Sequence, residues 1–155
     1  MKYARLPLQD LKDLEKEFID FLVINGIPAE DWEKIKKEDQ NKVEELLDLF
    51  SDIIWEDVLS KTKIVEHRRF ERLTVCKIIN DELITLVIKS NDPTFDFTKA
   101  ENTEKVILNL ADFQMNIQKS KIQKETNLQL FELLELGFYI VSDSNYEKLF
   151  EQLNQ

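Results

Sequence analysis

The chain of 155 residues has few of the residue types from which recognisable active sites are built: two glycines, three prolines, one histidine and one cysteine. Glycine-rich phosphate loops and Cys/His clusters therefore cannot be assembled from it. The lone Cys76 excludes an intrachain disulfide, and a structural zinc site needs four Cys or His ligands where only two such residues exist. We accordingly predict no metal and no cofactor.

Long apolar runs are also missing. The longest, such as residues 21–24 and 138–141, are far too short to span a bilayer. The N-terminus runs into a charged amphipathic stretch without the apolar core of a signal peptide. The sequence therefore predicts a cytoplasmic protein with no membrane association.

Composition fits one globular domain over residues 1–155, with 43% hydrophobic residues and a net charge of −10. An acidic protein repels phosphate backbones overall, so bulk charge disfavours nucleic-acid binding. The segment 61–77 is the exception, with six Lys or Arg against two Glu.

Helical spacing dominates the first 60 residues. A first helix is predicted from about Pro7 to a Schellman ending at Gly26, with Ile27 and Leu22 as its apolar pair. A second is predicted after Pro28, and a third, capped by Asp39, runs to about residue 59.

Apolar residues then recur at every second position over residues 63–69, 73–80 and 83–89. This alternation predicts a small antiparallel meander with a hairpin at 80–82. Three capping-box spacings follow, beginning at Thr98, Ser120 and Ser144. They predict C-terminal helices, the first with its apolar residues at 106, 110, 113 and 117, although residues 106–110 also fit a strand. Gly137 closes the middle helix in a second Schellman ending, with Phe138 and Leu133 as its apolar pair.

The predicted fold is therefore α+β: mainly helical, with N-terminal helices, a central antiparallel meander and C-terminal helices. The stretches 25–39 and 47–59, followed by Val65-Glu-His-Arg68, resemble a family of short, acidic, uncharacterised proteins from Bacteroidota-type bacteria. The resemblance is best over the N-terminal half. It implies a bacterial cytoplasmic protein and brings no activity, ligand or catalytic residue.

An acidic face on the third predicted helix is the first candidate site. Asp48, Asp52 and Glu56 fall opposite its apolar arc, and Trp55 lies at the edge of that arc. A solvated face is one interpretation, and docking of a basic protein partner through these four residues is the other. A divalent-metal enzyme would need a second acidic element facing Glu45 and Asp48, and residues 101, 104 and 112 are the available carboxylates.

The basic segment 61–77 is the second candidate. His67, Arg68, Arg69 and Arg72 would form an anion- or RNA-binding site, but alternation along a strand divides the arginines between two faces. Intramolecular ion pairing is the competing interpretation.

Catalysis by the lone histidine has little support. His67 could act as a base oriented by Glu71, whereas Glu66 points to the opposite face of the strand. Cys76 lies in an apolar strand, where a structural thiol is expected. Both tryptophans fit either the core or a partner surface.

These observations favour a non-enzymatic protein-interaction module, an adaptor or accessory subunit of a bacterial cytoplasmic complex with an unidentified protein partner. The wide apolar helix arcs also permit a homodimer. The alternative is an RNA- or nucleotide-binding protein that uses segment 61–77. The third hypothesis is a carboxylate/divalent-metal enzyme.

Overall fold

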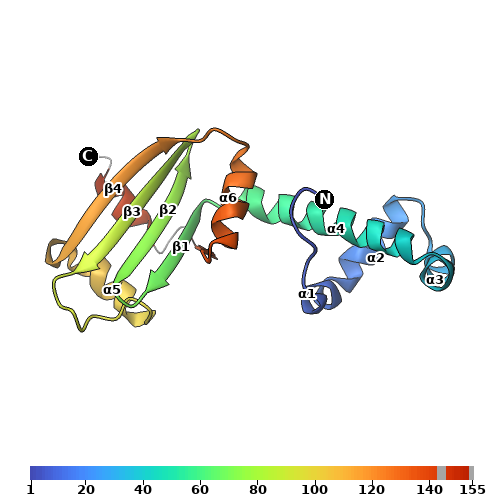
Figure 1. Cartoon of the computed structure of the whole chain (residues 1–155), viewed down its shortest axis with the longest axis horizontal. Coiled ribbons are helices and arrows are strands. Elements are labelled where there is room, and N and C mark those ends of the chain that lie inside the picture. Colours follow the sequence, from blue (N-terminus) through green and yellow to red (C-terminus); the bar gives the residue numbers. More distant parts are fainter. Residues whose placement is uncertain (143–145, 154–155) are drawn as a thin grey trace. The chain divides into compact units, whose positions relative to one another are not determined.

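The computed structural model describes residues 1–142 and 146–153, and it divides into two compact units, residues 1–60 and 61–155. Each unit is described by itself (Figure 1). That residues 1–155 form one domain stays a prediction.

The first unit is helical, and its elements are α1 (Leu8–Asp13), α2 (Glu15–Ile24), α3 (Ala29–Glu38) and α4 (Gln40–Lys61). The predicted first helix is divided at Leu14, so α1 and α2 are separate. The Schellman ending is confirmed: Ile27 N donates to Leu22 O over 2.8 Å, and Gly26 has φ +75°. Asp39 Oδ1 accepts from Lys42 N over 3.1 Å, which confirms it as a cap of α4.

Aromatic rings hold the helical unit together. The Phe18 ring meets those of Phe50 and Trp32 edge-on, with centroids 5.1 and 5.3 Å apart. Leu22, Leu46 and Phe50 are buried. Trp32 therefore packs in this aromatic cluster, which was one of its two predicted roles.

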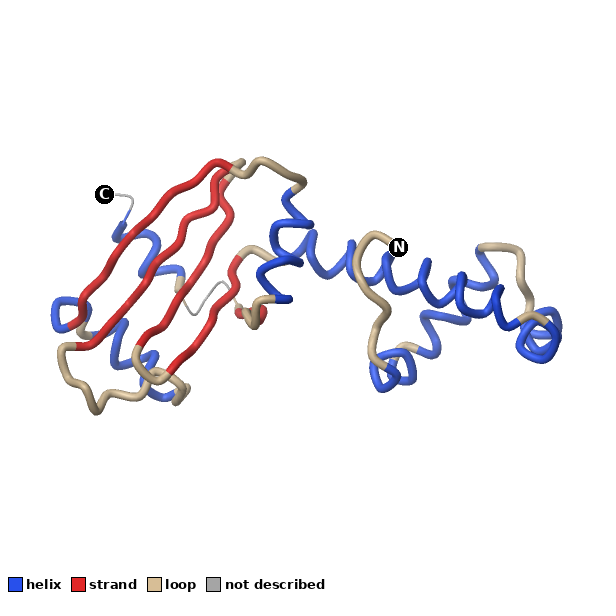
Figure 2. Tube along the Cα trace, viewed as in Figure 1, coloured by secondary structure: helices blue, strands red, loops and turns tan. Residues whose placement is uncertain are grey.

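The second unit contains a five-stranded antiparallel sheet in the order β4-β3-β2-β1-β5 (Figure 2). Its strands are β1 (Ile64–Arg69), β2 (Arg72–Ile79), β3 (Glu82–Ser90), β4 (Phe113–Lys121) and β5 (Tyr139–Val141). Its helices are α5 (Glu101–Leu108), the 3-10 turn η1 (Leu110–Asp112), α6 (Thr126–Glu135) and α7 (Glu147–Leu153).

One face of the sheet forms the core of this unit. Ile64, Val75 and Leu86 lie on that face and are fully buried. They belong to one apolar cluster with Val106 of α5 and Phe150 of α7. We call the opposite face, which includes Arg69 and Arg72, the polar face. The α+β fold class predicted from the sequence is confirmed.

Several element predictions in the C-terminal half were wrong. Residues 113–117, predicted as helix, belong to β4, and Ser120 lies in β4 where it was expected to cap a helix. Thr98 caps no helix, because α5 has no side-chain cap. Ser144 lies outside the described residues. Strand β5 was not predicted.

The second Schellman ending is confirmed, with Phe138 N donating to Leu133 O over 3.1 Å and φ +100° at Gly137. Of the described residues, no helix has the length and apolar character needed to cross a membrane.

Candidate functional site

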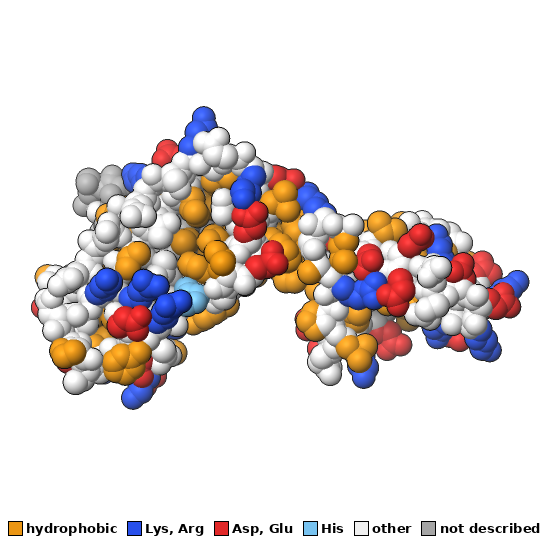
Figure 3. Space-filling view, viewed as in Figure 1, with side chains coloured by type: hydrophobic (Ala, Val, Ile, Leu, Met, Phe, Trp, Pro, Cys, Tyr) orange, Lys and Arg blue, Asp and Glu red, His pale blue; other side chains and the backbone are white. Residues whose placement is uncertain are grey.

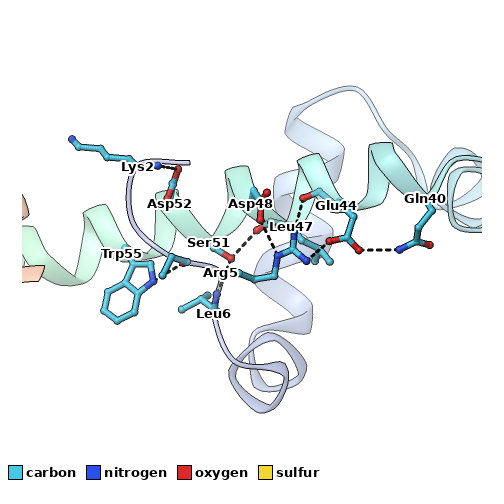
Figure 4. Close-up of polar contacts among 11 residues, drawn as sticks. Lys2, Arg5, Leu6, Gln40, Glu44, Leu47, Asp48, Ser51, Asp52 and Trp55 are labelled. Carbon is cyan, nitrogen blue, oxygen red and sulfur yellow. Dashed lines mark hydrogen bonds and ion pairs between the residues drawn. The ribbon is translucent and has the colours of Figure 1, made fainter. Parts of the chain in front are cut away.

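Helix α4 carries a stripe of four carboxylates at intervals of four residues: Glu44, Asp48, Asp52 and Glu56. Such spacing places side chains on one face of a helix. The chain's own residues 2–6 run along this face in an extended segment (Figure 4). We call the carboxylates with Ser51 and Trp55 the α4 stripe, and residues 2–6 the N-terminal segment.

Backbone groups of the N-terminal segment provide the most regular contacts with the stripe. The amides of Lys2 and Tyr3 donate to the two oxygens of Asp52 over 2.7 and 2.9 Å. The amide of Leu6 donates to Ser51 Oγ over 3.1 Å. In the other direction, Trp55 Nε1 donates to the Ala4 carbonyl over 3.0 Å. These hydrogen bonds recognise the backbone of an extended segment and do not depend on the identity of its side chains.

Arg5 provides the principal side-chain contact. Its Nε and Nη2 atoms donate to Asp48 Oδ1 over 2.8 and 2.6 Å, and Nη1 forms an ion pair with Glu44. Hydrogen bonds to Glu44 and then Asp48 raise the pKa of Arg5, and the Arg5 guanidinium lowers the pKa of Glu44. The Arg5 side chain is 33% exposed, so solvent screening weakens these pairs.

The segment's first residues complete the contact. The Tyr3 hydroxyl donates to Glu56, and Lys2 Nζ lies 3.3 Å from the same carboxylate. Burial, followed by the hydrogen bond to Glu56, raises the pKa of Tyr3.

The structure thus brings the predicted partner-binding residues Trp55, Asp48, Asp52 and Glu56 onto one surface, where each contacts the N-terminal segment. The sequence prediction missed Glu44 and Ser51. The four-residue spacing could have revealed Glu44, whereas nothing local identifies Ser51 as the acceptor for an amide 45 residues away.

The second candidate site lies on the polar face. In the strand register Arg69 of β1 is opposite Arg72 of β2, which is opposite Lys89 of β3. The next row on this face contains His67, Thr74 and Val87 in the same register. Rows of this kind place side chains of adjacent strands within about 5.5 Å, so the cations form a continuous group. Figure 3 shows blue side chains gathered beside the pale-blue histidine.

In residues 1–142 and 146–153, no carboxylate forms an ion pair with Arg69, Arg72 or Lys89, although Glu71 lies in the adjacent turn. The buried Nε of Arg72 has no hydrogen-bond partner in the same part of the chain. Buried donors are normally satisfied, so this atom is a donor that the described part of the chain leaves unsatisfied.

A hollow of about 370 Å³ opens over these side chains, lined by His67, Arg69, Arg72, Thr74, Val87, Leu136 and Phe138. The His67 ring lies 5.2 Å from the Phe138 ring, centroid to centroid. A neighbouring hollow of about 520 Å³ shares Val87 and includes Lys89, Gln114 and Asn116 in its lining.

Arg68 does not belong to this cationic group. Its side chain is only 11% exposed and pairs with Glu66, with Nε 2.7 Å from Oε1. It also donates to the carbonyl of Phe97 over 3.1 Å. The predicted intramolecular pairing is therefore present for Arg68, within one strand rather than across strands.

Glu66 is 3% exposed and also accepts from the Tyr146 hydroxyl. Burial and then Glu66 raise the pKa of Tyr146. This buried cluster of Glu66, Arg68 and Tyr146 connects β1 to the residue preceding α7.

Among the residues that the structure describes, no combination typical of an enzyme forms around His67 or Cys76. No hydrogen bond or ion pair joins His67 to a carboxylate in the described part of the chain. Cys76 is 2% exposed, and burial raises the pKa of its thiol, which disfavours the reactive thiolate. Among described residues, no three His, Cys, Asp or Glu side chains converge as a metal site requires.

The helical unit has an apolar hollow of about 480 Å³ among Leu8, Phe18, Ile19, Val23 and Trp32. Charged side chains at 12, 15, 33 and 36 also line it, and Lys36 pairs with Glu33 over 2.8 Å. It offers apolar contact area and no catalytic combination.

Comparison with protein families matches residues 1–155 to the Family of unknown function (DUF6495). Searches among curated proteins and among solved structures gave no match.

Proposed function

The chain belongs to the family of unknown function DUF6495, and we propose its role from its own geometry. It is a non-enzymatic protein-interaction module, an adaptor or accessory subunit of a bacterial cytoplasmic complex. It binds an extended, arginine-containing segment of its partner along the α4 stripe.

The observation that carries this proposal is the N-terminal segment seated on the stripe. Three of its amides and one carbonyl are hydrogen-bonded by Asp52, Ser51 and Trp55. Any extended peptide offers the same backbone groups. The stripe therefore selects mainly through the guanidinium that Glu44 and Asp48 hold, and an arginine at the equivalent place in a partner satisfies that selection.

Binding of the partner requires displacement of the N-terminal segment. The segment is tethered, so it competes as an intramolecular ligand at a high effective concentration. The apparent affinity for a partner is then the intrinsic affinity multiplied by the fraction of molecules with an open stripe. Weakening the segment should therefore strengthen binding of a partner, while weakening the stripe should abolish it.

Substitutions in the segment and in the stripe should change the affinity for a partner in opposite directions, and this difference gives the test. The probe is a fluorescent peptide that copies residues 1–7, titrated into the full chain and followed by anisotropy. Arg5→Ala removes the guanidinium that pairs with Glu44 and Asp48, so we expect this variant to bind the peptide several-fold more tightly than the unsubstituted chain. Asp48→Asn added to Arg5→Ala should remove that gain. Lys16→Ala, an exposed cation of α2, is the matched control and should change nothing.

A peptide that binds Arg5→Ala no better than the unsubstituted chain would contradict the proposal. A pull-down with the Arg5→Ala chain after nuclease treatment then identifies the partner, which must be lost again on Asp48→Asn. Light scattering on the same sample reports whether the occupant is the N-terminal segment of a second copy.

A further inference from the structure

We infer that the polar face of the sheet is a second binding site, for a single-stranded nucleic acid, and that it recognises the strand through its phosphates. The α4 stripe takes no part in this site, because its carboxylates would repel the same ligand. The inference therefore stands or falls independently of the proposed protein interaction.

The first argument is the placement of charge. Alternation divides the arginines of β1, as the sequence predicts, but the strand register then brings Arg69, Arg72 and Lys89 together from three strands. Arg69 and Lys89 are exposed and Arg72 is half-buried. In a protein of net charge −10, three cations that lie side by side and form no ion pair with any described carboxylate provide a local site for an anion.

The second argument is the chemistry of the donors. Guanidinium groups bind phosphate in a bidentate manner and are preferred over lysine where planar recognition matters. The Nε of Arg72 is buried and has no partner in the described residues, so a phosphate oxygen could accept from it only after a local side-chain movement. Thr74, in the next row, adds a hydroxyl beside them.

The third argument is the extent of the surface, which favours a strand over a mononucleotide. The hollow of about 370 Å³ and the one of about 520 Å³ are both lined in part by Val87. The surface therefore crosses from β1 to β4, where Gln114 and Asn116 are exposed. His67 and Phe138 supply rings at one end. Bases stack on such rings, and amide side chains hydrogen-bond to base edges.

The test uses the full chain and a fluorescent oligouridylate of roughly 12 nucleotides, a length in the range that single-strand-binding domains cover. Three neutralised phosphates give a salt slope of about −2 for a single strand, so a fourfold increase in salt should weaken binding about twentyfold. Arg69→Gln with Lys89→Gln, both at exposed positions, should reduce the slope by about 1.4 and weaken binding at low salt.

Lys105→Gln, an exposed cation of α5, is the matched control for charge and should leave both quantities unchanged. Circular dichroism checks that each variant is folded. Absence of binding at low salt, or binding that Arg69→Gln/Lys89→Gln leaves unchanged, would overturn the inference. Equal competition by uridine monophosphate and by the oligonucleotide at matched phosphate concentration would show a mononucleotide site and would overturn it too.

Discussion

The buried cluster of Glu66, Arg68 and Tyr146 makes a demanding prediction about stability. Glu66→Leu removes the carboxylate that accepts from both Arg68 and Tyr146. The Arg68 side chain is 11% exposed and Tyr146 is 1% exposed, so little water can reach the place of the lost acceptor. Breaking a buried pair from one side costs about 3–5 kcal/mol. Domains of ordinary stability unfold with about 5–15 kcal/mol, so this substitution should remove a large share.

Urea unfolding, monitored by far-ultraviolet circular dichroism, measures the loss of stability. The cluster lies in the sheet-containing unit, so the unfolding of that unit reports the effect. A second substitution tests the cause. If the cost arises from an uncompensated buried cation, Arg68→Met should be less damaging in the Glu66→Leu background than in the unsubstituted chain. We expect a coupling energy of at least about 1 kcal/mol in the double-mutant cycle. Additive effects, or a cost below about 1 kcal/mol for Glu66→Leu alone, would refute the reasoning.

Three further predictions concern single positions. Gly137→Ala should cost about 1–3 kcal/mol by thermal unfolding, because φ is +100° and the new Cβ would lie 3.1 Å from His67 Nε2; an unchanged melting temperature would contradict it. Tyr146 has its pKa raised above the ordinary value of 10.0, so above that pH the unfolded tyrosine loses its proton first and stability falls as pH rises. Tyr146→Phe should reduce this alkaline loss, and an identical pH profile would argue against it. Ser51→Ala leaves the buried Leu6 amide without its acceptor and should cost about 1–3 kcal/mol in urea unfolding, whereas Ser60→Ala, at an exposed site of the same helix, serves as the comparison.

Some features governed by neighbouring residues could be predicted from the sequence, although the capping boxes at Thr98 and Ser120 did not form. Both Schellman endings occur at the predicted glycines with the predicted partners, and Asp39 caps α4. Such motifs involve contacts within about six residues, so the sequence contains all the groups that form them. The three strands of the meander follow for the same reason, since their alternation is a local property.

Predictions failed where one pattern fitted two structures. The apolar residues Val106, Leu110, Phe113 and Ile117 have helical spacing, yet 113, 115 and 117 also alternate as in a strand. Pairing with β3 over nine residues decided in favour of β4. Strand β5 is three residues long and forms by pairing with β1, which a short apolar run does not predict on its own.

The sequence by itself determined the α+β class, the two helix ends at Gly26 and Gly137 and part of each candidate surface, because periodicity and local backbone contacts act over short distances. Only the tertiary structure decided what those surfaces contain. The acidic face of α4 receives residues 2–6 from more than 35 positions away. The strand register separates Arg68 from Arg69 and Arg72 and adds Lys89. Contacts between distant residues depend on how the elements pack and pair, and that information is not carried by any single stretch of sequence.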